Sequence, residues 1–150
     1  MLSNDVCRIL VTCNAATAWW MTGLVWFVAV VHYPLFESVG REAFPEYHAR
    51  HVRRTQLVVV VPMFVELILT LLIAVFSPFG GLFSKLAWLG MASVAAVWAC
   101  TFLRQVPDHE RLKSGFDASV HRALVRGNYL RSVFWTTHAA ITIGQCLTMS

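Results

Sequence analysis

Residues 55–77 read TQLVVVVPMFVELILTLLIAVFS, and this stretch decides the fold class. Its side chains are almost all apolar, with Glu66 as the one charged residue and Pro62 as a break in the backbone hydrogen bonding. A helix rises about 1.5 Å per residue, so a stretch of this length crosses the hydrocarbon core of a bilayer. The sequence therefore predicts a transmembrane helix with a carboxyl group near its middle.

Three more stretches of the chain share this apolar character. The 150 residues are 57% hydrophobic and only 13% charged, whereas soluble domains carry about 25% charged residues. This composition argues against a soluble globular protein and against a disordered one. The charged residues divide the chain into four apolar segments within a single domain over residues 1–150. The predicted membrane spans are residues 9–31, 55–77, 83–103 and 132–149.

The basic residues set the predicted orientation. Ten of the twelve Lys and Arg side chains lie in the connections that follow the first and third spans, which leaves only Arg8 and Lys85 elsewhere. The positive-inside rule places these connections in the cytoplasm and both termini outside, in the inner (plasma) membrane. Residues 77–81, SPFGG, predict a short turn that makes spans two and three antiparallel neighbours. We expect an all-α, integral-membrane, up-down-up-down four-helix bundle.

Helices two and four are expected to continue beyond the membrane into the cytoplasm. Pro45 fits the first turn of a helix that runs without a breaker into span two. Asp117 is a suitable N-cap for a helix that runs into span four. These two extensions are expected to form a polar vestibule over the cytoplasmic end of the bundle.

Glu66 and His138 form the predicted acid–base pair. A carboxylate in a membrane span costs roughly 2.5–3.5 kcal/mol to insert, so Glu66 should face the bundle interior and have a partner. Both residues lie about 12 residues from the outer ends of their spans, which places both about 18 Å deep. We therefore assign catalytic roles to Glu66 and His138. Arg131 is the third catalytic candidate, because it follows the polar face of span four, where it can bind an anionic or carbonyl-bearing substrate. The alternative for Glu66 is a protonated side chain that only hydrogen-bonds a neighbouring helix.

One face of span four is too polar to contact lipid. Its members recur at steps of three or four residues, which places them on one side of a helix. They are Asn128, Arg131, Trp135, His138, Thr142 and Gln145. We expect this face to line the bundle interior, with Asn128 and Trp135 as substrate-binding residues. Tyr33, at the cytoplasmic end of span one, is the third substrate-binding candidate.

Five of the six histidines lie on the predicted cytoplasmic side. His48 and His51 are three residues apart on one helix, so both can reach one ion, and imidazole suits iron, copper, zinc and nickel. The predicted metal ligands are His32, His48, His51 and His109, with iron or copper as the metal and haem as another candidate. His51 and Glu66 lie about 22 Å apart along one helix, so a metal sits either at the mouth or beside Glu66. The alternative is a set of ordinary hydrogen-bonded interfacial histidines.

Five short motifs resemble those of a known family. They are YPLF (residues 33–36), FPEYHARHVRR (44–54), P-M-x-x-E-L (62–67), Q-V-P-x-H-E-R-L (105–112) and NYLRSVFW (128–135). Over most of its length the chain resembles the anthrone oxygenase-like family of small four-span membrane proteins. Fungal members of that family oxidise an anthrone to an anthraquinone with molecular oxygen, and histidines and iron are implicated there. The resemblance implies these matching site positions: His48, His51, Glu66, His109, Asn128 and Arg131.

Two functions remain open. The first is a membrane-embedded, metal-dependent oxidoreductase or oxygenase that acts on a lipophilic aromatic or quinol-like substrate from the bilayer. The second is a non-enzymatic haem- or metal-binding or proton-relay subunit of a larger membrane complex. A glutathione-type four-span enzyme fits less well, because span two lacks the arginine and asparagine pattern of that superfamily. The expected partners are a lipophilic small molecule, the lipid bilayer, and either further copies of this chain or other membrane subunits, with no nucleic acid.

Overall fold

The computed structural model describes residues 1–149 of the chain. No strand occurs among these residues, so the predicted all-α class is confirmed. In chain order the elements are α1 (Asn4–Phe27), the π-helical turn η1 (Val28–His32), the 3₁₀-helical turn η2 (Pro34–Ser38), α2 (Phe44–Phe76), α3 (Gly81–Cys100), the π-helical turn η3 (Thr101–Gln105), α4 (Val106–Leu112) and α5 (Ala118–Leu147). Since η1 and η2 prolong α1, and η3 and α4 prolong α3, the chain forms four helical rods.

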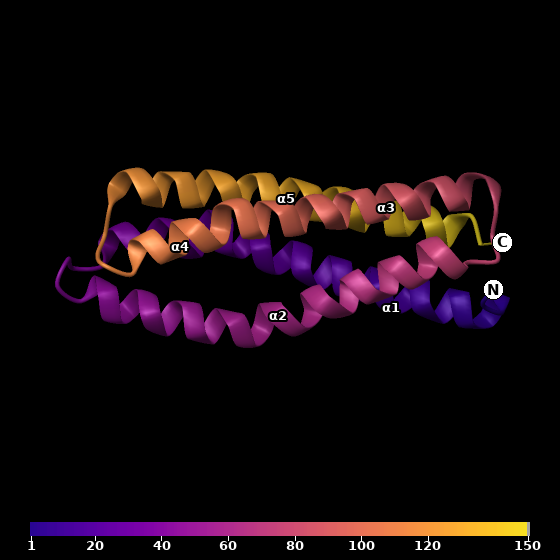
Figure 1. The fold of residues 1–150 in the computed structure, drawn as a ribbon, viewed down its shortest axis with the longest axis horizontal. Helices are drawn as coiled ribbons and strands as arrows, with labels where there is room; N and C mark the ends of the chain where they lie inside the picture. The colour runs from indigo at the N-terminus through magenta and orange to yellow at the C-terminus, as the bar shows by residue number, and fades with distance from the viewer. Residues whose placement is uncertain (150) are drawn as a thin grey trace.

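The four rods lie side by side in an elongated bundle (Figure 1). Both termini and the turn between α2 and α3 lie at one end, here called the terminal end. The connections from η2 to α2 and from α4 to α5 lie at the other end, here called the mouth. α1 packs against α2 and α5, and α3 packs against the same two helices. Each rod therefore has two neighbours around a shared interior.

Three of the rods are long and apolar enough to cross a membrane: Asn4–Ser38, Phe44–Phe76 and Gly81–Leu112. Within residues 1–149, α5 is long enough to cross a membrane, but its composition is not apolar enough to place it among these candidates. Its inward face carries a series of polar side chains, which lower its mean hydropathy although they are buried in the bundle. The three apolar rods indicate a membrane protein, and the crossing by α5 stays a prediction.

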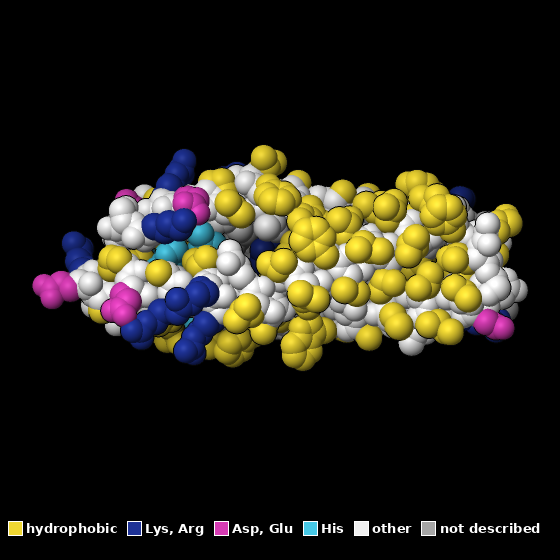
Figure 2. Space-filling view, turned by 60° about the horizontal axis from the view of Figure 1, so that its bottom comes forward, with side chains coloured by type: hydrophobic (Ala, Val, Ile, Leu, Met, Phe, Trp, Pro, Cys, Tyr) yellow, Lys and Arg dark blue, Asp and Glu magenta, His cyan; other side chains and the backbone are white. Residues whose placement is uncertain are grey.

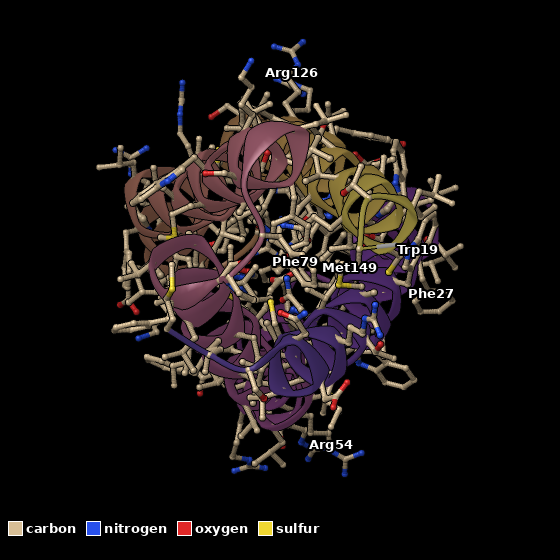
Figure 3. The ribbon with its side chains drawn as sticks, turned by 90° about the vertical axis from the view of Figure 1, so that its right-hand side faces the viewer. Trp19, Phe27, Arg54, Phe79, Arg126 and Met149 are labelled. Atoms are coloured by element: carbon tan, nitrogen blue, oxygen red, sulfur yellow. The ribbon has the colours of Figure 1, made fainter. Side chains whose placement is uncertain are left out.

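The outer surface of the bundle agrees with a membrane environment. Trp19 and Phe27 point away from the bundle in the end view of Figure 3, and both are exposed. Figure 2 shows hydrophobic side chains along most of one face, with the histidines gathered at the mouth beside many Lys and Arg side chains. An apolar girdle next to a charged end suits a bilayer and its aqueous border.

The predicted helix starts are confirmed, and each has a local cause. α2 begins at Phe44 with Pro45 in its first turn, where the missing proline N–H costs no helical hydrogen bond. Asp117 caps α5, because its Oδ1 accepts hydrogen bonds from the backbone N–H groups of Ser119 and Val120, at 2.7 and 3.0 Å. Hydrogen bonds from the Ser119 side chain and from these backbone amides hold the pKa of Asp117 below its usual value.

The third rod is longer than predicted. The third span was expected to end at residue 103, but α3, η3 and α4 continue together to Leu112. Pro107 lies inside this rod, where a proline removes a backbone donor and crowds the preceding turn. The π-helical turn Thr101–Gln105 just before it widens the backbone, so the rod continues past the proline. The mouth is therefore built by η2, the start of α2, α4 and the start of α5.

The interior is layered along the bundle axis. At the terminal end an apolar cluster closes the bundle, and Phe79 and Met149 lie near the centre of this end in Figure 3. A second cluster in the middle includes Met63 and Trp135. A third cluster at the mouth is rich in aromatic rings, among them Phe36. Two buried histidines lie within this aromatic cluster, where His48 stacks on Phe44 and His121 stacks on Phe36.

Candidate functional site

A pocket of about 410 Å³ lies between α2 and the rod made of α3, η3 and α4. Its outer part is apolar and includes Val59, Phe64, Trp98 and Phe102. Phe64 and Phe102 are exposed on the outer surface of the bundle, so this part of the pocket adjoins the apolar girdle. This part of the pocket is therefore next to the apolar outer surface of the bundle.

The inner part of the pocket is polar. Tyr33, His51, Gln105, His109 and Arg131 contribute to its wall, and they come from four separate parts of the chain. The hydroxyl of Tyr33 donates to Gln105 Oε1 at 3.3 Å, and its oxygen lies 3.0 Å from His109 Nε2. An apolar entrance that leads to a few converging polar groups is typical of a small-molecule site.

Two histidine pairs extend from this polar wall. His109 Nδ1 lies 3.0 Å from His48 Nε2, so Tyr33, His109 and His48 form a continuous hydrogen-bonded chain. His51 Nδ1 lies 2.7 Å from His32 Nε2. Because the Tyr33 hydroxyl donates to Gln105, His109 Nε2 donates to Tyr33, and the Nδ1 of neutral His109 accepts from His48 Nε2. In the other bridge either nitrogen can carry the hydrogen. Each pair therefore joins two imidazole rings by a hydrogen bond.

His51 lies between two hollows of the molecule. It lines the pocket, and it also lines a second hollow of about 330 Å³ together with His32, Arg50 and Arg54. Its Nδ1 is held by His32, whereas its Nε2 is buried and has no hydrogen-bond partner within residues 1–149. The Nε2 nitrogen is therefore a buried atom beside the pocket, unpaired within the described residues, and Nδ1 faces His32, which lines the second hollow.

The structure brings the four predicted metal ligands together. The rings of His32, His48, His51 and His109 lie with neighbouring centroids 4.7–6.3 Å apart. Their nitrogens face one another in two hydrogen-bonded pairs instead of converging on one point. In the part of the chain that the structure describes, no group of three or more His, Cys, Asp or Glu side chains is arranged to hold a metal ion. The side chains as placed do not fit iron or copper, and metal or haem binding stays a prediction.

Arg131 contributes the cationic part of the pocket wall, and only 7% of its surface is exposed. Its Nη1 donates a long hydrogen bond of 3.4 Å to Thr101 Oγ1, and its Nε has no partner within residues 1–149. Its guanidinium carbon lies 5.3 Å from the centroid of the Trp135 ring. The guanidinium therefore contacts an aromatic face and a hydroxyl group, both of which are neutral.

Glu66 and His138 meet in the bundle interior, as predicted. Glu66 Oε1 lies 3.7 Å from His138 Nε2, and both side chains are almost fully buried. Glu66 Oε2 accepts a hydrogen bond of 2.7 Å from Trp135 Nε1. Trp135 therefore binds this carboxyl group, and none of the three residues belongs to the pocket wall. The two side chains of the predicted acid–base pair therefore meet outside the wall of this pocket, and their acid–base role stays a prediction.

Two partners of this pair were not among the predicted site residues. Asn14 Nδ2 lies 3.5 Å from His138 Nε2, and the Thr70 hydroxyl donates to Asn14 Oδ1 at 3.2 Å. Asn14 is the one amide side chain of residues 9–31. Its position in the first span, at about the depth of Glu66 and His138, could have identified it as a partner of this pair. This polar group links α1, α2 and α5 across the interior.

Asn128 also lies away from the pocket wall, although it was predicted to bind substrate. Its Nδ2 donates to the backbone oxygen of Val25 at 3.1 Å, and its side chain is fully buried. This hydrogen bond ties α5 to α1 close to the mouth. The contact accounts for a polar residue on the inward face of α5, and a role in substrate binding stays a prediction.

Gln105 is a member of the pocket wall that was not predicted. Its Nε2 donates to the backbone oxygen of Leu124 at 3.2 Å, which orients its Oε1 toward the pocket's tyrosine. Gly127 permits this approach to α5, because a Cβ atom there would lie 2.9 Å from Gln105 Nε2. Gln105 could have been identified from the sequence, because it is the first residue of the QVPDHERL segment that also contains His109.

Comparison of the chain with protein-family models, with curated proteins and with solved structures finds no match.

Proposed function

We propose that this protein is a membrane-embedded oxidoreductase that binds a lipophilic, phenol- or quinol-like aromatic molecule. The binding site is the pocket between α2 and the rod of α3, η3 and α4. One observation carries the proposal: an apolar entrance on the outer surface leads to a wall where Tyr33, His51, His109 and Arg131 meet. In this arrangement the ring system of the ligand occupies the apolar part, and its oxygen atom meets the hydrogen-bonding groups.

His51 is the proposed general base. Its Nε2 is a buried nitrogen without a partner in residues 1–149, and a neutral imidazole nitrogen can accept the proton of an acidic substrate. Its Nδ1 lies 2.7 Å from His32 Nε2, so a proton gained at Nε2 can be balanced by one released toward His32. His32 lines the second hollow at the mouth. The substrate proton thus has a route to the charged surface.

The oxidising half of the reaction rests on the resemblance to anthrone oxygenase-like proteins. A methylene carbon between two aromatic rings becomes a carbonyl carbon when both of its C–H bonds break and one atom of dioxygen binds to it. The second oxygen atom leaves with the two hydrogens as water, so dioxygen accepts four electrons. The residues of this chain bind the substrate, orient its oxygen and take up its first proton.

Filling the pocket tests the binding site. Val59→Trp places a large side chain in the pocket, whereas Val133→Trp places the same side chain in a separate groove between α1, α3 and α5. We expect Val59→Trp to abolish anthrone binding and Val133→Trp to leave it at the wild-type level. Equilibrium dialysis against protein in lipid nanodiscs, with empty nanodiscs as reference, measures both. Equal binding by the two variants would show that the ligand lies elsewhere.

Replacing the base tests the chemistry separately from binding. We expect His51→Gln to retain anthrone binding but to lower oxygen consumption by about 10²–10⁴-fold, the usual contribution of a general base. An oxygen electrode measures the rate, and the binding measurement on the same sample shows that the variant is folded. A wild-type rate in His51→Gln would exclude this residue as the base.

A proton-relay subunit of a larger membrane complex is the second candidate function. The observation that favours it is the buried polar group around Glu66 and His138, which lies outside the pocket wall. In this case Glu66→Gln would block proton transfer by the assembled complex, while anthrone binding would be absent from the wild-type protein. Purification of the protein in mild detergent with its associated subunits, followed by proton-uptake measurements, separates the two functions.

We also propose that the rods form an up-down-up-down bundle in the inner membrane. The positions of the chain ends and connections in Figure 1 support this order. The concentration of basic residues in the two long connections supports a cytoplasmic mouth and external termini. The pocket then lies at the cytoplasmic end of the hydrocarbon layer.

A further inference from the structure

Arg131 is a buried cation in the wall of the proposed binding pocket. Its exposed surface is only 7%, and none of the ion pairs within residues 1–149 includes it. Glu110 also lines the pocket, but its carboxylate pairs with Lys113 at 2.7 Å. Glu66 is separated from the guanidinium by Trp135, whose ring lies against Arg131 while its N–H binds the carboxyl group. Within residues 1–149 no carboxylate therefore forms an ion pair with Arg131.

The environment of Arg131 selects the charge of the ligand. A buried charge is strongly unfavourable unless an opposite charge or several hydrogen bonds compensate for it. Arg131 has one long hydrogen bond to Thr101 and an Nε without a partner. Guanidinium groups in such positions bind planar oxygen anions through two parallel hydrogen bonds. A ligand that brings a negatively charged oxygen to this wall supplies the missing interaction.

We infer that the ligand of this pocket is a lipophilic anion, an apolar body with one negatively charged oxygen group that Arg131 binds. The inference rests on the proposed function, because it assigns the charge of the ligand in the same pocket. A phenolate or enolate and a fatty-acid carboxylate share this chemistry. In the first case the anion forms when His51 removes the proton, and Arg131 stabilises it because the guanidinium is already in place.

Acid and amide pairs of equal shape test the inference. The aromatic pair is 2-anthracenecarboxylate and 2-anthracenecarboxamide, and the aliphatic pair is palmitate and palmitamide. Binding to the full-length protein in nanodiscs is measured by equilibrium dialysis at neutral pH. We expect the wild-type protein to bind the acid at least about tenfold more tightly than the amide in one pair. The pair that shows this preference identifies an aromatic or a fatty-acid ligand.

Variants of Arg131 assign the preference to this side chain. We expect Arg131→Met to bind acid and amide equally, and Arg131→Lys to keep part of the preference, since lysine retains the charge but lacks the planar fork. Arg131→Gln is the second neutral variant and takes the place of Arg131→Met if that variant does not fold. A preference for the acid that survives in the neutral variant would assign charge recognition to another residue and overturn the inference.

The remaining outcomes separate the inference from the proposed function. Equal affinities for acid and amide in the wild-type protein, together with their loss in Val59→Trp, would overturn the inference and leave the pocket in place. Absence of binding by all four compounds, or binding that Val59→Trp does not change, would overturn the pocket itself and the inference with it.

Discussion

Glu66 illustrates, for a single residue, how a carboxyl group is accommodated in an apolar interior. Its Oε2 accepts a hydrogen bond from the Trp135 indole, and its Oε1 lies 3.7 Å from the imidazole of His138. Burial of a polar group costs less free energy when the group is hydrogen-bonded, and within residues 1–149 only Oε2 of this carboxyl group has a hydrogen-bond partner. The carboxyl group in turn satisfies the buried indole N–H, so the two side chains stabilise each other.

This mutual dependence predicts the effect of substitutions at Glu66. We expect Glu66→Ala to lower the free energy of unfolding by about 1–3 kcal/mol, because the indole N–H of Trp135 loses its acceptor. The cavity left by the shorter alanine side chain should lower it further. Glu66→Gln keeps an oxygen acceptor for the indole and should cost less. Unfolding in mixed micelles measures the difference, with exposed Glu46→Ala as the control. A wild-type stability for Glu66→Ala would contradict the importance of this hydrogen bond.

Two π-helical turns are the elements that shape the mouth. η1 lies directly before Tyr33 and Pro34, and η3 ends at Gln105, two residues before Pro107. In the first turn the Tyr33 N–H binds the backbone oxygen of Val28, five residues earlier, at 2.9 Å. A π-helical turn adds one residue to the helix and rotates the side chains that follow it. Both turns therefore affect which residues face the pocket.

Two glycines in the long helices offer a test at the level of helix packing. A Cβ atom at Gly90 on α3 would lie 3.3 Å from two ring atoms of His138, whereas a Cβ at Gly23 on α1 meets nothing within 4 Å. Alanine stabilises a helix by about 1 kcal/mol relative to glycine. We expect Gly23→Ala to raise the melting temperature and Gly90→Ala to raise it less or to lower it. Equal increases in thermal unfolding experiments would show that His138 can shift without cost.

The whole molecule has two chemically different ends. The terminal end is closed by an apolar cluster, whereas the mouth contains five histidines, the polar part of the pocket and the second hollow. The exposed apolar side chains lie on the rods between these ends. In the proposed membrane arrangement, this division places the pocket near one border of the hydrocarbon layer.

The direction across the membrane can be measured with two lysine positions. Lys113 lies at the mouth and Lys85 near the terminal end. In a variant whose four native cysteines are replaced, we expect Lys113→Cys to react with a membrane-impermeant maleimide only in inverted vesicles. Lys85→Cys should react in intact spheroplasts, because the positive-inside rule places it outside. The reverse pattern would invert the proposed topology and place the pocket at the external border.

Much of the fold could be predicted because its causes are local. Pro45 and Asp117 set the starts of α2 and α5 through backbone hydrogen bonding, and apolar runs of sufficient length specify the helices. The extension to Leu112 could not be predicted, because the π-helical turn that carries the rod past Pro107 has no clear signal in the sequence. Counting residues from the span ends correctly paired Glu66 with His138, since helical rise is nearly constant.

The sequence by itself determined the helical class, the apolar girdle, the basic mouth and the inward face of α5, since composition and periodicity specify each of them. Only the tertiary structure decided which histidines pair, that Trp135 binds Glu66 and not the pocket, and that Tyr33, His51 and Arg131 share one wall. The physical reason is that rotations at π turns and the path of the connections set side-chain directions. The side-chain directions depend on how the rods pack against one another, and no local pattern in the sequence encodes that packing.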